Sequence, residues 1–390
     1  MQELARKHTE ELQLRLQRRN IDLALVMDED SLTYLTSFWG YFGIDFGRPS
    51  FALLPNAKDP TLITPLIEKT MAEAMTWISD IRPWNDDAGE QWDQVVSEFL
   101  AGDAYVTIGV DANNLYPPVR AFLEERFPSI QIVDISSELA DMRAVKSPEE
   151  IDIMKKAGDI ALSMAIAARG SIQEGIPEYE IALAINNAAV RKAAEFLTDG
   201  GFHQFVSPLI HSQQVMQSGE NTTMAHMRAS VRRLKRGDAV YFCFCGMARF
   251  MEYKLGFDRN FFVDEISKKH EKVYQTTLDA QDKVINLIKP GAIAEDIYFA
   301  AREVYLSNGY SPAYRVGRGI GISNLEKPEL KAGDKTILKE GMTLTADGGI
   351  TVTDVIGIRI SDSLVVTESG NISLTPYTRD LIVVDNSRGT

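Results

Sequence analysis

The first 140 residues alternate between helical and strand-like hydrophobic patterns. Within 3–19 the apolar positions Leu4, Leu12 and Leu16 lie among charged residues, which predicts a surface helix. A short apolar run follows and predicts a buried strand. Further strand-like runs occupy 50–55, 59–65, 105–111 and 130–135, and helical patterns occupy 66–77 and 119–127. Strands that alternate with helices indicate an α/β domain over residues 1–140.

The pattern changes near residue 141, where a long helix is predicted. Ser147 suits an N-cap, Pro148 suits the first helical position, and Glu150 completes a capping box before an apolar stripe of helical period. Strand-like runs alternate with further helices and occupy 238–245, 257–264, 341–350, 357–367 and 379–384. Long helices combined with a mostly antiparallel sheet predict an α+β domain over residues 141–390.

Two segments of the second domain resemble each other. IQEGIPEYEI at 172–181 and IKPGAIAEDI at 288–297 both indicate a turn with a Gly that leads into a helix. An internal duplication and a chance similarity of two helix starts explain the pattern equally well at this stage.

The charge balance excludes two classes of partner. The 390 residues include 55 Asp and Glu against 41 Lys and Arg, a formal net charge of -14. Nucleic acids and anionic membranes both require a positive surface, so neither is expected as a partner. The opening segment lacks the pattern of a signal peptide, and no stretch of ~18 apolar residues follows. We therefore expect a cytoplasmic protein.

Only two cysteines occur, Cys243 and Cys245. Two residues apart on a predicted strand, they would face the same side in poor geometry for a mutual disulfide. The pattern favours a reduced pair packed in the sheet over a redox or metal site.

An ordered set of segments resembles the family of prolidase, methionine aminopeptidase and creatinase. The segments are RAVKSPEEIDIMKKA, SGENTTMAH, LKRGDAV, FDRNFFV, IKPGAIAEDI, GRGIGISNLEKP, LKEGMTLTADGG and IGIRISDSLVVTESG. The resemblance covers the second domain from end to end and the first domain more loosely. It implies a creatinase-like N-terminal domain followed by a catalytic domain with the pita-bread fold, whose two halves are related by pseudosymmetry.

The peptidases of this family bind two metal ions with two Asp, one His and two Glu. By the resemblance, the matching positions in this sequence are Cys243, Gly256, Arg318, Asp347 and Ser361. A divalent cation requires several deprotonated ligands, and Arg318 would place a fixed positive charge among them. From these positions we expect no metal, no other cofactor and no metallopeptidase activity.

The resemblance is closest to creatinase, the branch that works without metal. The segment FGRP matches the creatinase segment that supplies a Phe and a carboxylate-binding Arg, which fall on Phe46 and Arg48. In a homodimer, these two residues would reach the active site of the partner subunit. The loop SGENTTMAH places a catalytic histidine at His226. Catalytic acids fall on Asp258 and Asp347, each one methylene shorter than the glutamates of creatinase. Further substrate-binding candidates are Tyr253, Lys254, Arg318 and Glu326.

These residue types together suit a small zwitterionic substrate. An arginine can bind a carboxylate in a bidentate manner, two acids suit a positive centre, and a histidine can transfer protons. We predict a metal-independent lyase that eliminates dimethyl sulfide and acrylate from dimethylsulfoniopropionate. The alternatives are a creatinase-type C–N hydrolase and a non-catalytic binding module of the same fold.

Overall fold

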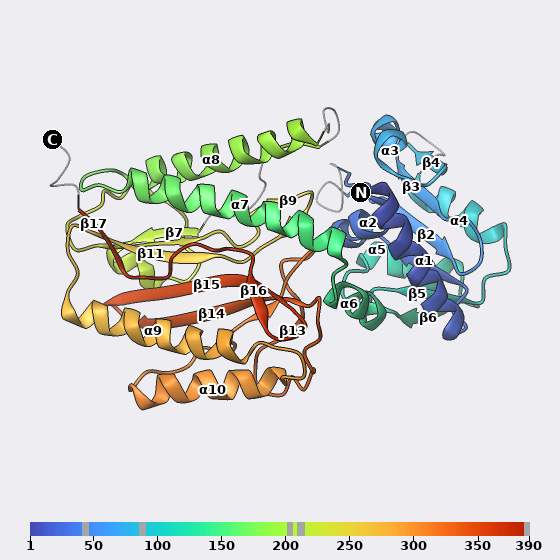
Figure 1. Ribbon diagram of the computed structural model, residues 1–390. Helices are drawn as coiled ribbons and strands as arrows, with labels where there is room; N and C mark the ends of the chain where they lie inside the picture. Colours follow the sequence, from blue (N-terminus) through green and yellow to red (C-terminus); the bar gives the residue numbers. More distant parts are fainter. Residues whose placement is uncertain (41–46, 86–90, 201–205, 209–214, 386–390) are drawn as a thin grey trace. The chain divides into compact units, whose positions relative to one another are not determined.

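A computed structural model of the chain describes residues 1–40, 47–85, 91–200, 206–208 and 215–385. The chain divides into two compact units, Met1–Met142 and Arg143–Thr390 (Figure 1). This confirms the predicted two-domain architecture of an α/β domain followed by an α+β domain.

The first unit contains a six-stranded mixed sheet with the order β4-β3-β2-β1-β5-β6. Strand β1 pairs in parallel with β5 and antiparallel with β2, and its four residues are all buried. The strands are β1 (Leu23–Val26), β2 (Phe51–Pro55), β3 (Thr61–Pro65), β4 (Asp80–Trp84), β5 (Thr107–Val110) and β6 (Gln131–Asp134). The helices are α1 (Gln2–Arg18), α2 (Glu29–Thr36), α3 (Lys69–Met75), α4 (Trp92–Ala101), α5 (Pro117–Arg126) and α6 (Ser136–Ala144).

The second unit is built around a nine-stranded sheet. The sheet order is β13-β12-β14-β15-β11-β8-β7, and β16 and β17 pair with β15 and β11. The strands of this sheet are β7 (Val215–Ser218), β8 (Ala239–Cys243), β11 (Asp258–Val263), β12 (Arg318–Gly319), β13 (Glu326–Glu329), β14 (Thr343–Val352), β15 (Ile356–Val366), β16 (Asn371–Ser373) and β17 (Ile382–Val384). A separate hairpin consists of β9 (Arg249–Phe250) and β10 (Tyr253–Lys254).

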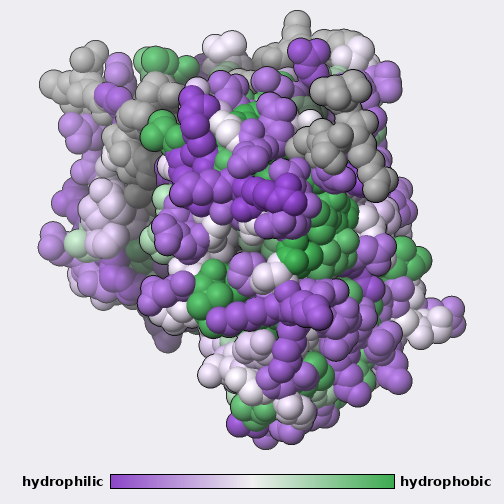
Figure 2. Space-filling view, turned by 90° about the vertical axis from the view of Figure 1, so that its left-hand side faces the viewer, coloured by the Kyte–Doolittle hydropathy of each residue, from purple (hydrophilic) through white to green (hydrophobic). Residues whose placement is uncertain are grey.

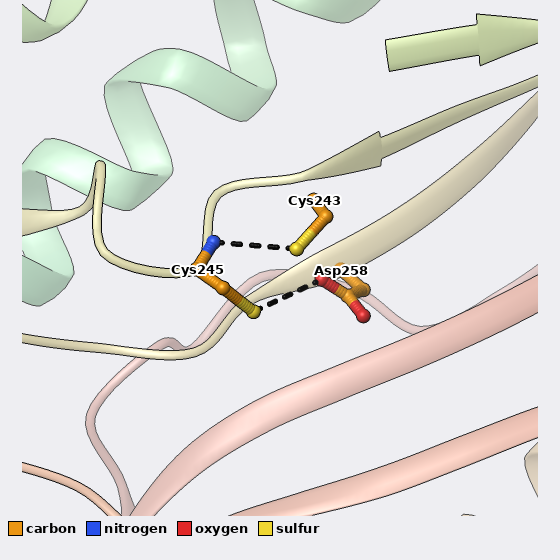
Figure 3. A group of neighbouring side chains, drawn as sticks. All are labelled: Cys243, Cys245 and Asp258. Carbon is orange, nitrogen blue, oxygen red and sulfur yellow. Dashed lines mark hydrogen bonds between the residues drawn. The ribbon is translucent and has the colours of Figure 1, made fainter. Parts of the chain in front are cut away.

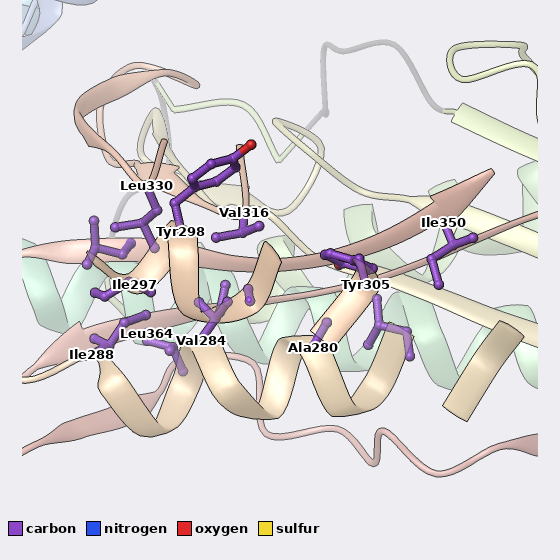
Figure 4. Close-up of a cluster of buried hydrophobic side chains, with 14 of the residues drawn as sticks. Ala280, Val284, Ile288, Ile297, Tyr298, Tyr305, Val316, Leu330, Ile350 and Leu364 are labelled. Carbon is purple, nitrogen blue, oxygen red and sulfur yellow. The ribbon is translucent and has the colours of Figure 1, made fainter. Parts of the chain in front are cut away.

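Two pairs of long helices cover this sheet. The pair α7 (Pro148–Ser171) and α8 (Glu178–Asp199) packs against one half of the second unit, and the pair α9 (Lys268–Leu287) and α10 (Ala294–Ser307) packs against the other half (Figure 1). Residues of α9 and α10 such as Val284 and Tyr305 pack against Ile350 and Leu364 of the sheet in the main hydrophobic core (Figure 4). No helix among the described residues is long and apolar enough to cross a membrane.

Hydrophilic residues predominate on the surface shown in Figure 2, and the hydrophobic residues there form smaller patches between them. This distribution accords with the acidic composition of the chain, because charged side chains are rarely buried without a partner.

The predicted capping box at the start of α7 is confirmed. The Ser147 hydroxyl accepts a hydrogen bond from the Glu150 amide at 3.3 Å, and the Glu150 carboxylate accepts one from the Ser147 amide at 2.8 Å. This reciprocal arrangement satisfies two amides at the helix N-terminus and makes the helix begin at Pro148.

The two halves of the second unit begin in the same way, which supports an internal duplication over chance. Gly175 and Gly291 have φ angles of +82° and +83°, values that favour glycine. The amide of Gly175 donates to Leu234 O, and the amide of Gly291 donates to Leu338 O in the same manner. Helix α8 and helix α10 each begin three residues after the glycine.

Helix α7 packs closely against the backbone that follows β16. A Cβ atom added at Gly158 would lie 1.8 Å from the carbonyl oxygen of Leu374, whereas one added at Gly170 in the same helix would meet nothing within 4 Å. Close approach of the helix therefore depends on glycine at the first position and not at the second.

Gly158→Ala is expected to lower the free energy of unfolding by about 1–3 kcal/mol, because the methyl group forces the helix away from its contact. Gly170→Ala is the control, and it should be neutral or stabilising by up to about 1 kcal/mol through helix propensity. Urea unfolding followed by circular dichroism measures both changes. Equal effects of the two substitutions would contradict the close contact at Gly158.

A buried ion pair links the start of the second unit to β13. The side chains of Lys146 and Glu326 are 1% and 3% exposed and form a salt bridge. The second carboxylate oxygen of Glu326 accepts a hydrogen bond from the Ser323 amide at 3.0 Å. A carboxylate held by a lysine and an amide is positioned firmly, and the pair ties together residues 180 positions apart in the sequence.

Lys146→Met should destabilise the protein by about 3–5 kcal/mol, because it leaves the Glu326 carboxylate buried without its counter-charge. Lys155→Met provides the control, since Lys155 pairs with Asp152 on the surface with both side chains more than 60% exposed. Loss of that exposed pair should change the stability by no more than about 1 kcal/mol. The urea midpoints of the two variants give the comparison, and similar midpoints would show that the Lys146 pair does not stabilise the fold.

Candidate active site

The candidate site lies where four neighbouring strands each place one side chain in a row across the sheet. In strand order the row consists of Cys243 on β8, Asp258 on β11, Ser361 on β15 and Asp347 on β14. Each of these residues lies opposite the next one in the register of the sheet. Directly opposed side chains on antiparallel strands are close neighbours, so the register alone assembles the row.

Asp347 is the centre of a polar network at one end of the row. Its carboxylate accepts hydrogen bonds from the Ser361 hydroxyl at 2.6 Å and the Thr345 hydroxyl at 3.1 Å. The guanidinium of Arg318 lies 3.5 Å from the same carboxylate. The Asp347 side chain is 25% exposed while that of Arg318 is 8% exposed. The acid of the pair can therefore be reached from solvent.

Hydrogen bonds from both the backbone and the side chain of Arg318 hold it in place. Its amide donates to the Thr345 hydroxyl at 3.1 Å, and its Nε donates to the carbonyl oxygen of Asn324 at 2.8 Å. Burial acts against its charge, but the neighbouring Cys245 and Asp347 raise the pKa of the Arg318 guanidinium above its usual value. The site therefore contains a fixed positive charge.

The opposite end of the row contains the two cysteines and Asp258 (Figure 3). The Cys245 thiol lies 3.7 Å from Asp258 Oδ1, and the Cys245 amide donates to Cys243 Sγ at 3.4 Å. The hydroxyl of Tyr241 donates to Asp258 Oδ2 at 3.2 Å. All three side chains thus point toward one another within a small part of the sheet.

The environment changes the proton affinity of these groups in opposite directions. Burial, together with the nearby Cys245 and Asp347, raises the pKa of the Asp258 carboxyl well above its usual range. A hydrogen bond with Cys243, followed by the charge of Arg318, lowers the pKa of the Cys245 thiol to about 6 in spite of burial. The hydrogen bond with Cys245 and burial raise the pKa of Cys243. Proton transfer between these groups is therefore coupled.

The predicted strand 238–245 ends earlier than expected. Strand β8 stops at Cys243, and Cys245 lies in a turn before Gly246, whose φ angle is +78°. The Cys245 thiol nevertheless lies beside Asp258, the residue opposite Cys243 in the register.

Five positions matched to the metal ligands of the family do not fit a dinuclear carboxylate site. Among them only Asp347 carries a carboxylate. A Cβ atom at Gly256 would lie 2.5 Å from the Thr345 methyl group, so the space for an acidic side chain there is filled. Arg318 already occupies the neighbourhood of Asp347 with a positive charge. No reaction step through a pair of metal ions follows from these residues.

Other predicted site residues lie in different surroundings. The Tyr253 hydroxyl donates to the Glu150 carboxylate at 2.8 Å, Lys254 donates to the carbonyl oxygen of Ile322, and Glu326 pairs with Lys146. These three contacts fix structural elements around the row.

The structure describes two of the three residues predicted from FGRP and the SGENTTMAH loop. Phe46 lies outside the described residues. Arg48 belongs to the first unit, where it is half-buried. His226 is exposed in the turn after the 3₁₀ helix Gly219–Thr223, and none of the hydrogen bonds or ion pairs of the described residues links it to Asp258 or Asp347.

Arg259 follows Asp258 in β11 but does not pair with its carboxyl. The Arg259 guanidinium pairs with Asp362 on β15 at 2.6 Å. It reaches only the backbone carbonyl of Asp258. Successive residues on a strand point to opposite faces, which separates the two side chains and leaves the Asp258 carboxyl to Tyr241 and Cys245.

Two family models match the chain. The model of metallopeptidase family M24 matches residues 152–368, and that of the creatinase/prolidase N-terminal domain matches residues 9–145.

Three curated relatives are similar over most of their length. The Xaa-Pro dipeptidase of Pyrococcus furiosus is 27% identical over 332 residues, which cover 85% of this chain and 88% of the relative. The agropine synthesis cyclase of Rhizobium rhizogenes is 26% identical, with 94% of both chains covered. The creatinase of a Bacillus species is 27% identical, with 89% of this chain and 83% of the relative covered.

Solved structures share the same architecture. The recombinant prolidase from Thermococcus sibiricus superposes with a TM-score of 0.84 at 25% identity and covers 96% of this chain and 98% of its own. The X-Pro aminopeptidase from Thermotoga maritima superposes with a TM-score of 0.82 at 23% identity, over 96% of this chain and 99% of its own. At this identity the similarity supports the fold and not the function. These neighbours confirm the predicted pita-bread fold of the second domain.

The comparisons contradict two predictions made from the sequence. The metal-independent lyase, together with its creatinase-type and non-catalytic alternatives, is contradicted by relatives that are named Xaa-Pro dipeptidases. The rejection of metallopeptidase activity is contradicted by the same relatives and by the matching family model.

The matched region 152–368 spans more than half of the chain and contains every residue of the row. The superposition on the prolidase from Thermococcus sibiricus agrees with this match. The chain belongs to metallopeptidase family M24.

Proposed function

We propose that the protein hydrolyses the amide bond of a small zwitterionic substrate, a dipeptide of the Xaa-Pro class. One pair of opposite charges carries the proposal. Asp347 belongs to the row, and the Arg318 guanidinium lies beside it, 3.5 Å from its carboxylate, both at positions matched to the family's active site. The similarity to Xaa-Pro dipeptidases over 85% of the chain supports this substrate class.

The two charges have separate roles in the proposal. Asp347 is partly exposed and accepts the ammonium group of the substrate. Arg318 is a buried donor whose position is fixed by Thr345 and Asn324, and it stabilises the negative charge that develops on the carbonyl oxygen. A donor that is held in position before the reaction requires little reorganisation during it.

Three further parts of the proposal depend on the family resemblance. Arg48 binds the substrate carboxylate, and in a homodimer it comes from the partner subunit. His226 takes part in proton transfer. The two thiols, which form no disulfide, suit a reducing compartment such as the cytoplasm.

Purified protein supplied with divalent cations should hydrolyse at least one Xaa-Pro dipeptide, measured by release of proline. Arg318→Gln should lower kcat about 100-fold or more, because it removes the donor to the developing oxyanion. Arg315→Gln is the matched control, since Arg315 forms a half-buried pair with Glu329 away from the row. The proposal fails if no Xaa-Pro or other dipeptide is cleaved, or if the two variants have equal kcat values.

Arg48→Ala should raise KM strongly with little change in kcat, because a carboxylate contact is present in both the bound substrate and the transition state. Arg6→Ala, which removes an exposed surface arginine, should change neither value. Mixing the Arg48→Ala and Arg318→Gln proteins tests the shared site. Partial recovery of activity in the mixed dimers is expected if each site takes Arg48 from the partner, and no recovery would place both arginines in one chain.

A second candidate function is ring closure within one substrate molecule. It is favoured by similarity to a relative named agropine synthesis cyclase, which covers 94% of both chains, and by the misfit of the dinuclear ligand set described above. Mass spectrometry separates the two reactions. Hydrolysis consumes one water and yields two products, whereas ring closure yields one product that is lighter by one water.

A further inference from the structure

Cys243, Cys245 and Asp258 together have the geometry of a metal-binding group. Their sulfur and carboxylate oxygen atoms all lie within 4.8 Å of one another, and the separation of Cys245 Sγ from Asp258 Oδ1 is 3.7 Å. Zn–S and Zn–O bonds of about 2.3 and 2.0 Å place the ligands of a tetrahedral ion about 3.5–3.8 Å apart. Small side-chain rotations would bring the three atoms onto one ion.

The backbone around these residues is well supported. Cys243 and Asp258 are opposed in the register of β8 and β11. Beyond Cys243 the pairing continues from the Phe244 amide to Phe257 O at 2.9 Å and from the Gly246 amide to Leu255 O at 3.2 Å. Cys245 is therefore held between two backbone hydrogen bonds rather than on a free loop, which limits the entropy that an ion would have to remove.

Neighbouring groups orient two of the three ligands. The Cys245 amide donates to Cys243 Sγ at 3.4 Å, and the Tyr241 hydroxyl donates to Asp258 Oδ2 at 3.2 Å, which leaves Oδ1 directed at Cys245. Hydrogen bonds from outer residues to metal ligands fix the ligand orientation and tune the site. Asp258 is only 8% exposed, whereas the two cysteines are partly exposed, so an ion could reach the group from solvent.

The charges of the site also balance when one divalent ion is bound. Two thiolates and one carboxylate carry three negative charges, and a divalent ion together with the nearby Arg318 carries three positive charges. The arginine that is unsuitable among the carboxylates of a dinuclear site is thus a counter-charge beside a thiolate-rich one.

We propose that Cys243, Cys245 and Asp258 bind one thiophilic divalent cation, Zn²⁺ in the cell, with a fourth position open to water or substrate. Thiolate ligands select zinc and cobalt over magnesium and manganese. Of the three residues, only Cys243 falls on a metal-ligand position of the family. A catalytic role of the ion rests on the proposed function. Binding of the ion does not, because it can be measured on the protein without substrate.

The test is titration of the reduced, chelator-treated full-length protein with Co²⁺, followed by absorption spectroscopy. One equivalent should produce the intense near-ultraviolet band of thiolate-to-cobalt charge transfer and the visible bands of tetrahedral cobalt. One equivalent of Zn²⁺ should displace the cobalt and raise the melting temperature. Because no substrate is present, a protein without dipeptidase activity can still bind the ion, and the two proposals fail independently.

Variants assign the ligands. Cys243→Ser and Cys245→Ser should each remove or strongly weaken the charge-transfer band, and Asp258→Asn should weaken cobalt binding at least tenfold. Asp347→Asn is the matched control, because it removes the carboxylate of the family's metal positions and should leave the band unchanged. If a cysteine variant does not fold, the Asp258 and Asp347 variants still decide the assignment.

Three results would overturn the proposal. The first is the absence of a thiolate-to-cobalt band in the reduced wild-type protein. The second is loss of cobalt binding in the Asp347 variant with retention in the cysteine variants. The third is binding of two equivalents that both depend on Asp347, which would restore the dinuclear arrangement.

Discussion

The register of four antiparallel strands determines what this protein can do. One residue from each of β8, β11, β15 and β14 stands in line across the sheet, and a shift of any strand by one residue would turn its side chain to the other face. The helix pairs α7/α8 and α9/α10 pack against the second unit, and most residues of its strands are buried. The packing of the whole unit thus sets the position of the row, and the four side chains that stand there set its chemistry.

Features that depend on local sequence could be predicted. The capping box at Ser147 involves residues within one helical turn, and the alternation of strands and helices in the first 140 residues reflects side-chain periodicity. The resemblance to the family predicted the pita-bread fold of the second domain. It also brought Asp258, Arg318 and Asp347 to attention, which the structure places in or beside one row.

Features that depend on distant residues could not be predicted. Glu326 pairs with Lys146, 180 positions earlier. Arg259 pairs with Asp362 on another strand rather than with its neighbour Asp258. The Cys245 thiol contacts Asp258 of β11, and the pairing of two separate strands brings them together. In each case a tertiary contact decides the role of the residue, and a single sequence carries no signal of that contact.

The packing of Thr345 against Gly256 limits the substitutions that this site accepts. The Thr345 methyl group fills the space next to Gly256, while its hydroxyl holds both the Arg318 amide and the Asp347 carboxylate. An aspartate introduced at position 256 would displace that methyl group and break both hydrogen bonds. An acidic side chain at position 256 therefore requires a change at position 345 as well, and that change would also release the Arg318 amide and the Asp347 carboxylate.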